Sequence, residues 1–118
     1  MDERDRAFFE DIGVSLDLWV EVAVQGLTDP ASTNYQARGA LTIIADALRA
    51  PEQREAFEAV LRETLTGLAH SIMVTLDGGS EYSEGLGSPQ LRHGDGQPFV
   101  AGLHEWLFDH LSRTGRLR

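Results

Sequence analysis

Residues 70–80, His70-Ser-Ile-Met-Val-Thr-Leu-Asp-Gly-Gly-Ser80, join a helix-patterned N-terminal half of the chain to a glycine-rich C-terminal half. The apolar run continues a stripe of apolar residues that lie three or four positions apart: Phe57, Leu61, Leu65, Leu68, Ile72 and Leu76. This spacing predicts a helix from Pro51 to Leu76, with Gly78 and Gly79 supplying a left-handed C-cap. The alternative ends the helix near Leu68 and makes residues 71–76 a strand, because Val and Thr favour strands.

The remaining elements are predicted from similar patterns. Asp5 to Ile12 is typical of a short helix, which Gly13 interrupts. Residues 14–27 alternate like a strand but also carry a helical stripe through Leu16, Val20 and Leu27, and we interpret them as a helix. The sequence then predicts a loop at 28–34 and a helix at 35–49 that ends before Pro51. It also predicts a loop at 80–98 and a last helix at 99–112.

These patterns predict a mainly α fold, in which residues 1–118 form one compact domain. Four to five helices would form a bundle, with a small β-hairpin or an ordered loop before the C-terminal helix. Asp95-Gly96 is a hairpin turn signal in that loop. If residues 14–24 or 71–76 are strands, the fold becomes an α+β two-layer domain.

Composition excludes several chemistries. The chain has 118 residues, of which 42% are hydrophobic, as in an ordinary globular protein. It has no cysteine, which removes disulfides, thiol nucleophiles and cysteine-held metals. All ten basic residues are arginine, so a Schiff-base lysine and a P-loop lysine are absent. With many Ala, Gly and Leu residues, this usage indicates a GC-rich bacterial genome.

The net charge of −9 points to the kind of partner. Residues 1–29 hold eight acids and two arginines, so −6 of the total lies there. An acidic surface repels phosphate, so we expect no nucleic-acid or membrane binding and favour a basic protein partner. Asp17 and Glu21, four residues apart, would form an acidic ridge that faces this partner. Trp19 or Trp106 would supply an aromatic anchor.

The N-terminus and the hydropathy pattern predict a cytoplasmic protein. Met-Asp-Glu-Arg-Asp-Arg lacks the basic and apolar regions of a signal peptide. No apolar run approaches the roughly 18 residues that a membrane span needs.

The histidines predict no metal or catalytic site from spacing alone. His104-Glu105 resembles the start of a zincin motif, but position 108 is Phe instead of the second histidine. His104 and His110 are six residues apart, about 240° around a helix, so they cannot clamp one ion alone. His70 and Ser71 are adjacent and would point apart. We therefore assign no catalytic residue, metal or cofactor.

The pattern His70-Ser71-x-x-Val74-x-Leu76-Asp77-Gly78-Gly79, followed by Gly102-Leu103-His104-Glu105, resembles a pattern in small acidic bacterial proteins of unknown function. Some proteins of similar build neighbour toxin or immunity genes. The resemblance covers residues 55–112 and brings no catalytic residues. It implies that His70, Asp77, His104 and Glu105 form one structural or binding cluster.

Three functions follow as hypotheses. The first is a non-enzymatic interaction protein of immunity or inhibitor type that binds a basic partner. The second is a ligand- or metal-binding enzyme with a pocket at His70, Asp77, His104 and Glu105. The third is a self-associating domain, since a helix as apolar as residues 14–27 often buries a second face against a twin, giving a homodimer.

Overall fold

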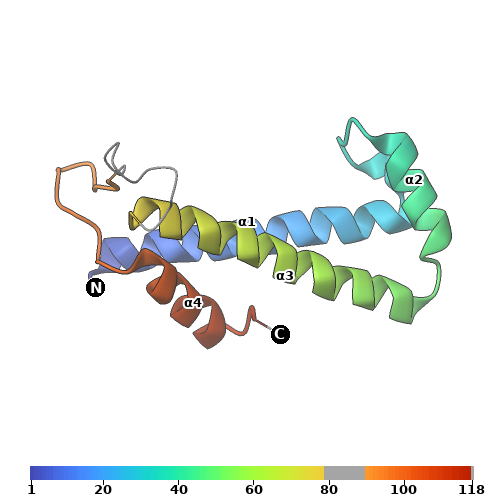
Figure 1. Cartoon of the computed structure of the whole chain (residues 1–118). Helices are drawn as coiled ribbons and strands as arrows, with labels where there is room; N and C mark the ends of the chain where they lie inside the picture. Colours follow the sequence, from blue (N-terminus) through green and yellow to red (C-terminus); the bar gives the residue numbers. More distant parts are fainter. Residues whose placement is uncertain (79–89, 118) are drawn as a thin grey trace.

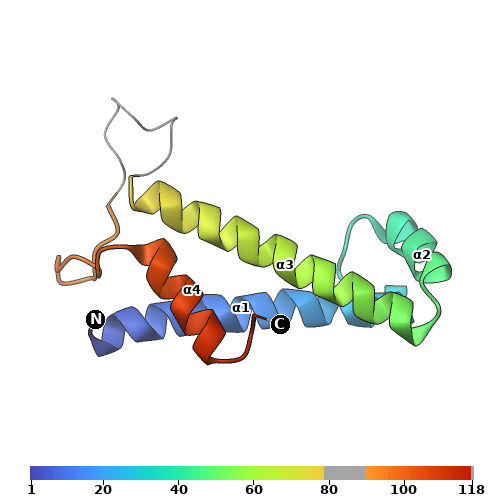
Figure 2. The ribbon, with the colours of Figure 1, turned by 60° about the horizontal axis from the view of Figure 1, so that its bottom comes forward.

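The structure is a computed structural model that describes residues 1–78 and 90–117. Two long helices, α1 (Glu3–Thr28) and α3 (Pro51–Leu76), run antiparallel along the length of the molecule (Figure 1). At one end they are joined through the 3-10 turn η1 (Pro30–Ser32) and α2 (Arg38–Ala47). At the other end α4 (Leu103–Arg113) packs against both, as Figure 2 shows. The prediction of a mainly helical bundle is confirmed.

The first helix is continuous, so the prediction of a break at Gly13 is wrong. Asp2 and Asp5 form a capping box that begins α1, because each side chain accepts the other's backbone N–H at 3.0 Å. The helix then passes through Gly13, which is buried. The strand alternative for residues 14–24 is also wrong, since the helical stripe of Leu16, Val20 and Leu27 is the buried one.

The third helix has the predicted bounds. Pro51 is its first residue, where the missing N–H costs no hydrogen bond. It continues through residues 71–76, so the strand alternative is wrong there too. Gly78 takes φ of 83°, in the left-handed region predicted for the C-cap. Gly79 and residues 80–89 lie outside the described residues.

The second and fourth helices are shorter than predicted. We expected residues 35–49 and 99–112, whereas α2 covers Arg38–Ala47 and α4 begins at Leu103. Gly102, with φ of 77°, precludes an earlier start for α4. The predicted hairpin does not form in residues 90–98, which hold a tight turn and one isolated bridge between Arg92 and Pro98. They form the predicted alternative, an ordered loop.

The 90–100 loop is anchored by a buried polar pair. His93 Nε2 lies 2.9 Å from Asp5 Oδ1, and both side chains are less than a tenth exposed. The His93 ring also stacks on Phe99, with 3.8 Å between centroids. This pair fastens the loop to the first turn of α1, and the loop in turn leads into α4.

The core has two parts. The larger part lies where α1, α3 and α4 meet, and its buried members are Phe9, Leu16, Met73, Leu103, Leu107 and Leu111. The smaller part joins α1 to α2 through Leu27, Leu41 and Ala45. Among the described residues no helix is long and apolar enough to cross a membrane.

The apolar stripe of α3 is only partly used by this core. Met73 is the one buried residue of α3, and it is not a member of the stripe. Leu68 and Ile72 are 58% and 49% exposed, and the other members are half-buried. The helix therefore carries more apolar surface than the described residues cover.

Candidate functional site

The four residues of the predicted cluster do meet, where the end of α3 approaches the start of α4. The rings of His70 and His104 lie edge to face, with 5.4 Å between centroids. His104 Nδ1 lies 2.6 Å from Asp77 Oδ2, and its Nε2 lies 3.8 Å from Glu105 Oε1. The structure thus brings together residues that are up to 35 positions apart in the sequence.

Asp77 has a structural task in this cluster. Its carboxylate accepts the backbone N–H of Leu103 at 2.9 Å and of His104 at 3.1 Å, which caps the N-terminus of α4. Burial raises the pKa of the Asp77 carboxyl, but the bonds from His104 and the two N–H groups lower it more, so its net pKa lies below the ordinary value. Asp77 also orients the His104 ring through its contact with Nδ1.

The cluster is not arranged as a preformed metal cage. Three His, Asp or Glu ligand atoms within 4.8 Å of one another occur only at Asp2, Asp5 and His93 within residues 1–78 and 90–117. There, the carboxylates of Asp2 and Asp5 already cap α1, and Asp5 also holds His93. Neither group is therefore a ready site for an ion.

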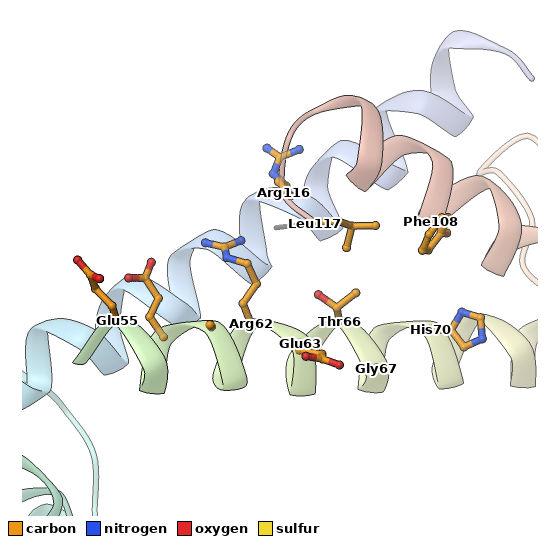
Figure 3. A pocket seen from close by; sticks show the side chains of 11 residues that line it. Glu55, Arg62, Glu63, Thr66, Gly67, His70, Phe108, Arg116 and Leu117 are labelled. Carbon is orange, nitrogen blue, oxygen red and sulfur yellow. The ribbon is translucent and has the colours of Figure 1, made fainter. Parts of the chain in front are cut away.

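A larger feature is the groove between α3 and α4, which has a volume of about 800 Å³ (Figure 3). Thr66 and His70 of α3 point toward α4, and Phe108 of α4 points back across the groove. Phe108 is 60% exposed, although it is a large apolar side chain. Along α3 the lining runs from Glu55 to His70, a distance of about 22 Å at 1.5 Å per residue.

The lining of the groove is apolar in the middle and acidic along α3. Ala59, Gly67 and Leu117 add to the apolar part. The acidic part consists of three glutamates to which the described residues offer no ion pair: Glu55, Glu58 and Glu63.

The two arginines beside these glutamates are neutralised from α1. Arg62 Nη1 binds Asp17 Oδ1 at 2.9 Å, and Arg116 Nε binds Asp17 Oδ2 at 2.8 Å. Arg116 also makes a two-pronged contact with Glu10, at 2.6 and 3.2 Å. His110 Nε2 approaches the same carboxylate at 2.7 Å. The groove consequently keeps the charge of its glutamates.

The pKa values of the two α1 acids follow from this network. Hydrogen bonds from Arg116 and then His110 lower the pKa of Glu10 from its ordinary value of 4.5 to about 2. Burial raises the pKa of Asp17, but hydrogen bonds from Arg116 and Arg62 outweigh it, so its net pKa is lowered. Both acids are ionised throughout the physiological range.

The predicted acidic ridge is divided between two environments. Asp17 binds two arginines of its own chain, as described above, whereas Glu21 is exposed and accepts a weak bond from Gln25 at 3.4 Å. Of the predicted anchors, Trp19 is 53% exposed and Trp106 packs partly against the core. Sequence reasoning missed the α3–α4 groove, whose only sequence signal is the series of glutamates at 55, 58 and 63.

Comparison with known proteins adds no family. No protein-family model, no curated protein and no solved structure matches the chain.

Proposed function

We propose that this protein is a non-enzymatic, cytoplasmic bacterial interaction protein of immunity or inhibitor type, which binds a basic amphipathic helix of a partner protein in the α3–α4 groove. The observation that carries the proposal is the combination of an apolar centre with three glutamates that have no ion pair among the described residues. Acidic side chains beside an apolar groove attract a helix that has leucines on one face and arginine or lysine at its border.

The dimensions of the groove support this class of ligand. An α-helix of about four turns is as long as the lined part of α3. Apolar side chains of the bound helix would contact the exposed Phe108 and Leu117, which is only partly buried against the core. Glu55, Glu58 and Glu63 would accept its cationic groups and raise the association rate.

A designed peptide tests the proposal without knowledge of the natural partner. The probe is a helical peptide of about four turns, built from Ala, Leu and Arg, and its twin has Glu in place of Arg. We expect the Arg peptide to bind in fluorescence anisotropy, to weaken with added NaCl, and to shift the NMR signals of Thr66, Gly67 and Phe108. We expect no binding of the Glu peptide.

Charge-matched variants locate the binding. Glu55→Gln, Glu58→Gln and Glu63→Gln together should weaken the Arg peptide about tenfold. The control combines Glu3→Gln, Asp11→Asn and Asp29→Asn, which are exposed acids on and just after α1, without an ion pair in the described residues. Equal losses in the two triple variants would mean that net charge, and not the groove, attracts the peptide, and would overturn the proposal.

The ligand- or metal-binding alternative keeps one observation in its favour, which is the approach of His70 to His104. A histidine whose Nδ1 is held by a carboxylate is oriented as in many zinc sites. Titration with Zn²⁺, followed by the NMR signals of both rings, tests this alternative. Saturable binding that His104→Ala abolishes would favour it over the groove proposal.

A further inference from the structure

The side of α3 that faces away from the groove has no partner among residues 1–78 and 90–117. Leu68 follows the groove-lining Thr66 by two residues, and Ile72 follows His70 by two, so each points about 200° around the helix from the groove. We call this side the outer face and define it by Val60, Thr64, Leu68, Ser71, Ile72 and Thr75. Helix α3 packs against α1 and α4, and neither covers it.

The outer face has the composition of an interface. Val60, Leu68 and Ile72 are 65%, 58% and 49% exposed. The thirteen residues from Thr64 to Leu76 contain no Asp, Glu, Lys or Arg, in a chain in which a quarter of the residues are charged. A solvated helix face normally carries charges, so this one is built for contact with another apolar surface.

The two threonine hydroxyls on the outer face are already hydrogen-bonded. The Thr64 hydroxyl donates to the Val60 carbonyl at 2.8 Å, and the Thr75 hydroxyl donates to the Ser71 carbonyl at 3.1 Å. Burial of these threonines would therefore leave their hydroxyls bonded and bring their methyl groups into contact.

The shape of the chain indicates how much surface is uncovered. Its radius of gyration is 17.2 Å, whereas a compact chain of this length has about 13.5 Å. It exposes 7855 Å², against roughly 6,300 Å² for a compact monomer of this mass. The excess of roughly 1,500 Å² per chain is more than the roughly 800 Å² that each partner contributes to a stable interface.

We infer that the occupant of the outer face is a second copy of this chain. The two α3 helices would pair antiparallel about a two-fold axis near Leu68, the midpoint of the outer face. Each copy supplies an antiparallel α1–α3 pair, so the dimer would be a four-helix bundle with α4 and the groove of each copy on its outside. A second copy fits because a two-fold contact needs only one self-complementary, uncharged face.

The charge of the chain separates this inference from the groove proposal, on which it does not rest. Two copies of net charge −9 repel each other, and salt screens the repulsion. We therefore expect NaCl to strengthen dimerisation, whereas it should weaken binding of a basic peptide in the groove. Failure of either proposal leaves the other testable.

Sedimentation equilibrium of the full chain tests the dimer. We expect twice the chain mass of 13.0 kDa at micromolar concentration. Leu68→Glu with Ile72→Glu should weaken the dimer at least about a hundredfold, because it would bury unpaired charges. Val14→Glu is the matched control: Val14 is 52% exposed, but on α1, in one row with Glu10 and Asp17. Circular dichroism checks that each variant stays helical.

The absence of cysteine permits a direct test of register. Leu68→Cys would place two thiols near the two-fold axis, and mild oxidation should cross-link most of the protein as dimers. Ile43→Cys, at a position 71% exposed on α2, should cross-link only slowly through collisions. A monomer at hundreds of micromolar, or a dimer that Val14→Glu disrupts and the double Glu variant does not, would overturn the inference.

Discussion

The guanidinium of Arg116 lies directly over Gly13. A Cβ built on Gly13 would come within 2.6 Å of Arg116 Nη1 and 2.8 Å of its central carbon. The arginine is held in this place by Glu10 and Asp17, one turn before and one turn after the glycine. Gly13 therefore leaves the room that the Arg116 side chain of the C-terminal segment needs, within a helix that is not interrupted.

Gly13→Ala should lower the free energy of unfolding by about 1 kcal/mol. Alanine improves helix propensity, but its methyl group would displace Arg116 from two carboxylates, and charged hydrogen bonds contribute more than propensity. Gly39→Ala, in α2 with no atom within 4 Å of its Cβ, is the matched control and should gain about 0.5 kcal/mol. Urea denaturation measures both, and an equal gain in the two variants would contradict this account.

The lowered pKa of Glu10 predicts loss of stability in acid. The unfolded state takes up a proton at Glu10 near pH 4.5 and the folded state only near pH 2, so stability from this group is complete above pH 4.5 and is lost as the pH falls toward 2. Glu10 is partly exposed, so the effect is well below that of a buried pair. Glu10→Gln should flatten the dependence of the unfolding free energy on pH between 4.5 and 2. An unchanged slope would refute the role of this pair.

Asp77→Ala should destabilise the protein by about 1–2 kcal/mol, because α4 loses its N-terminal cap. Asp77→Asn retains an acceptor oxygen and should cost less. Asp11→Ala, at an exposed acid without an ion pair in the described residues, should lie within about 0.5 kcal/mol of the parent. Chemical denaturation checks the order of the three, and an Asp77→Ala variant of parental stability would contradict the capping role.

His93→Ala should cost about 1–3 kcal/mol, because it leaves the buried Asp5 carboxylate without a side-chain partner and removes the ring that stacks on Phe99. The exposed His70 serves as the control, and His70→Ala should be nearly neutral. Thermal unfolding measures both variants. Similar melting temperatures for His93→Ala and the parent would show that the pair does not anchor the loop.

The sequence predicted the helices correctly where the preferences of neighbouring residues determine the backbone. Pro51 and Gly78 bound α3 as expected, and the row of Leu16, Val20 and Leu27 outweighed a strand-like alternation. The error at Gly13 has a tertiary cause, since its neighbour Arg116 is 103 positions away. The late start of α4 follows from Gly102, a local signal that we overlooked, while the side chain that caps α4, Asp77, comes from the residue after α3.

The candidate site was likewise predicted only in part from the sequence, because the rest of it depends on tertiary packing. The motif residues predicted that His70 and His104 would lie together, although it is Asp77 that explains why. By spacing, Glu58 and Arg62 would pair on the surface of α3. In the fold Arg62 turns to Asp17, so Glu58 has no ion pair in the part of the chain that the structure describes and gives the groove its charge. The packing of α1, α3 and α4 therefore decides which acid Arg62 binds, and the spacing in the sequence does not.

The central claim is that the surfaces of α3, and not a reaction at the histidines, carry the function. Native mass spectrometry of the protein, purified from its own cells without chelator, tests it most directly. We predict a dimer at twice the chain mass with no added metal or small ligand. A monomer that carries a metal or small molecule, lost in His104→Ala, would contradict the claim and support the ligand-binding alternative.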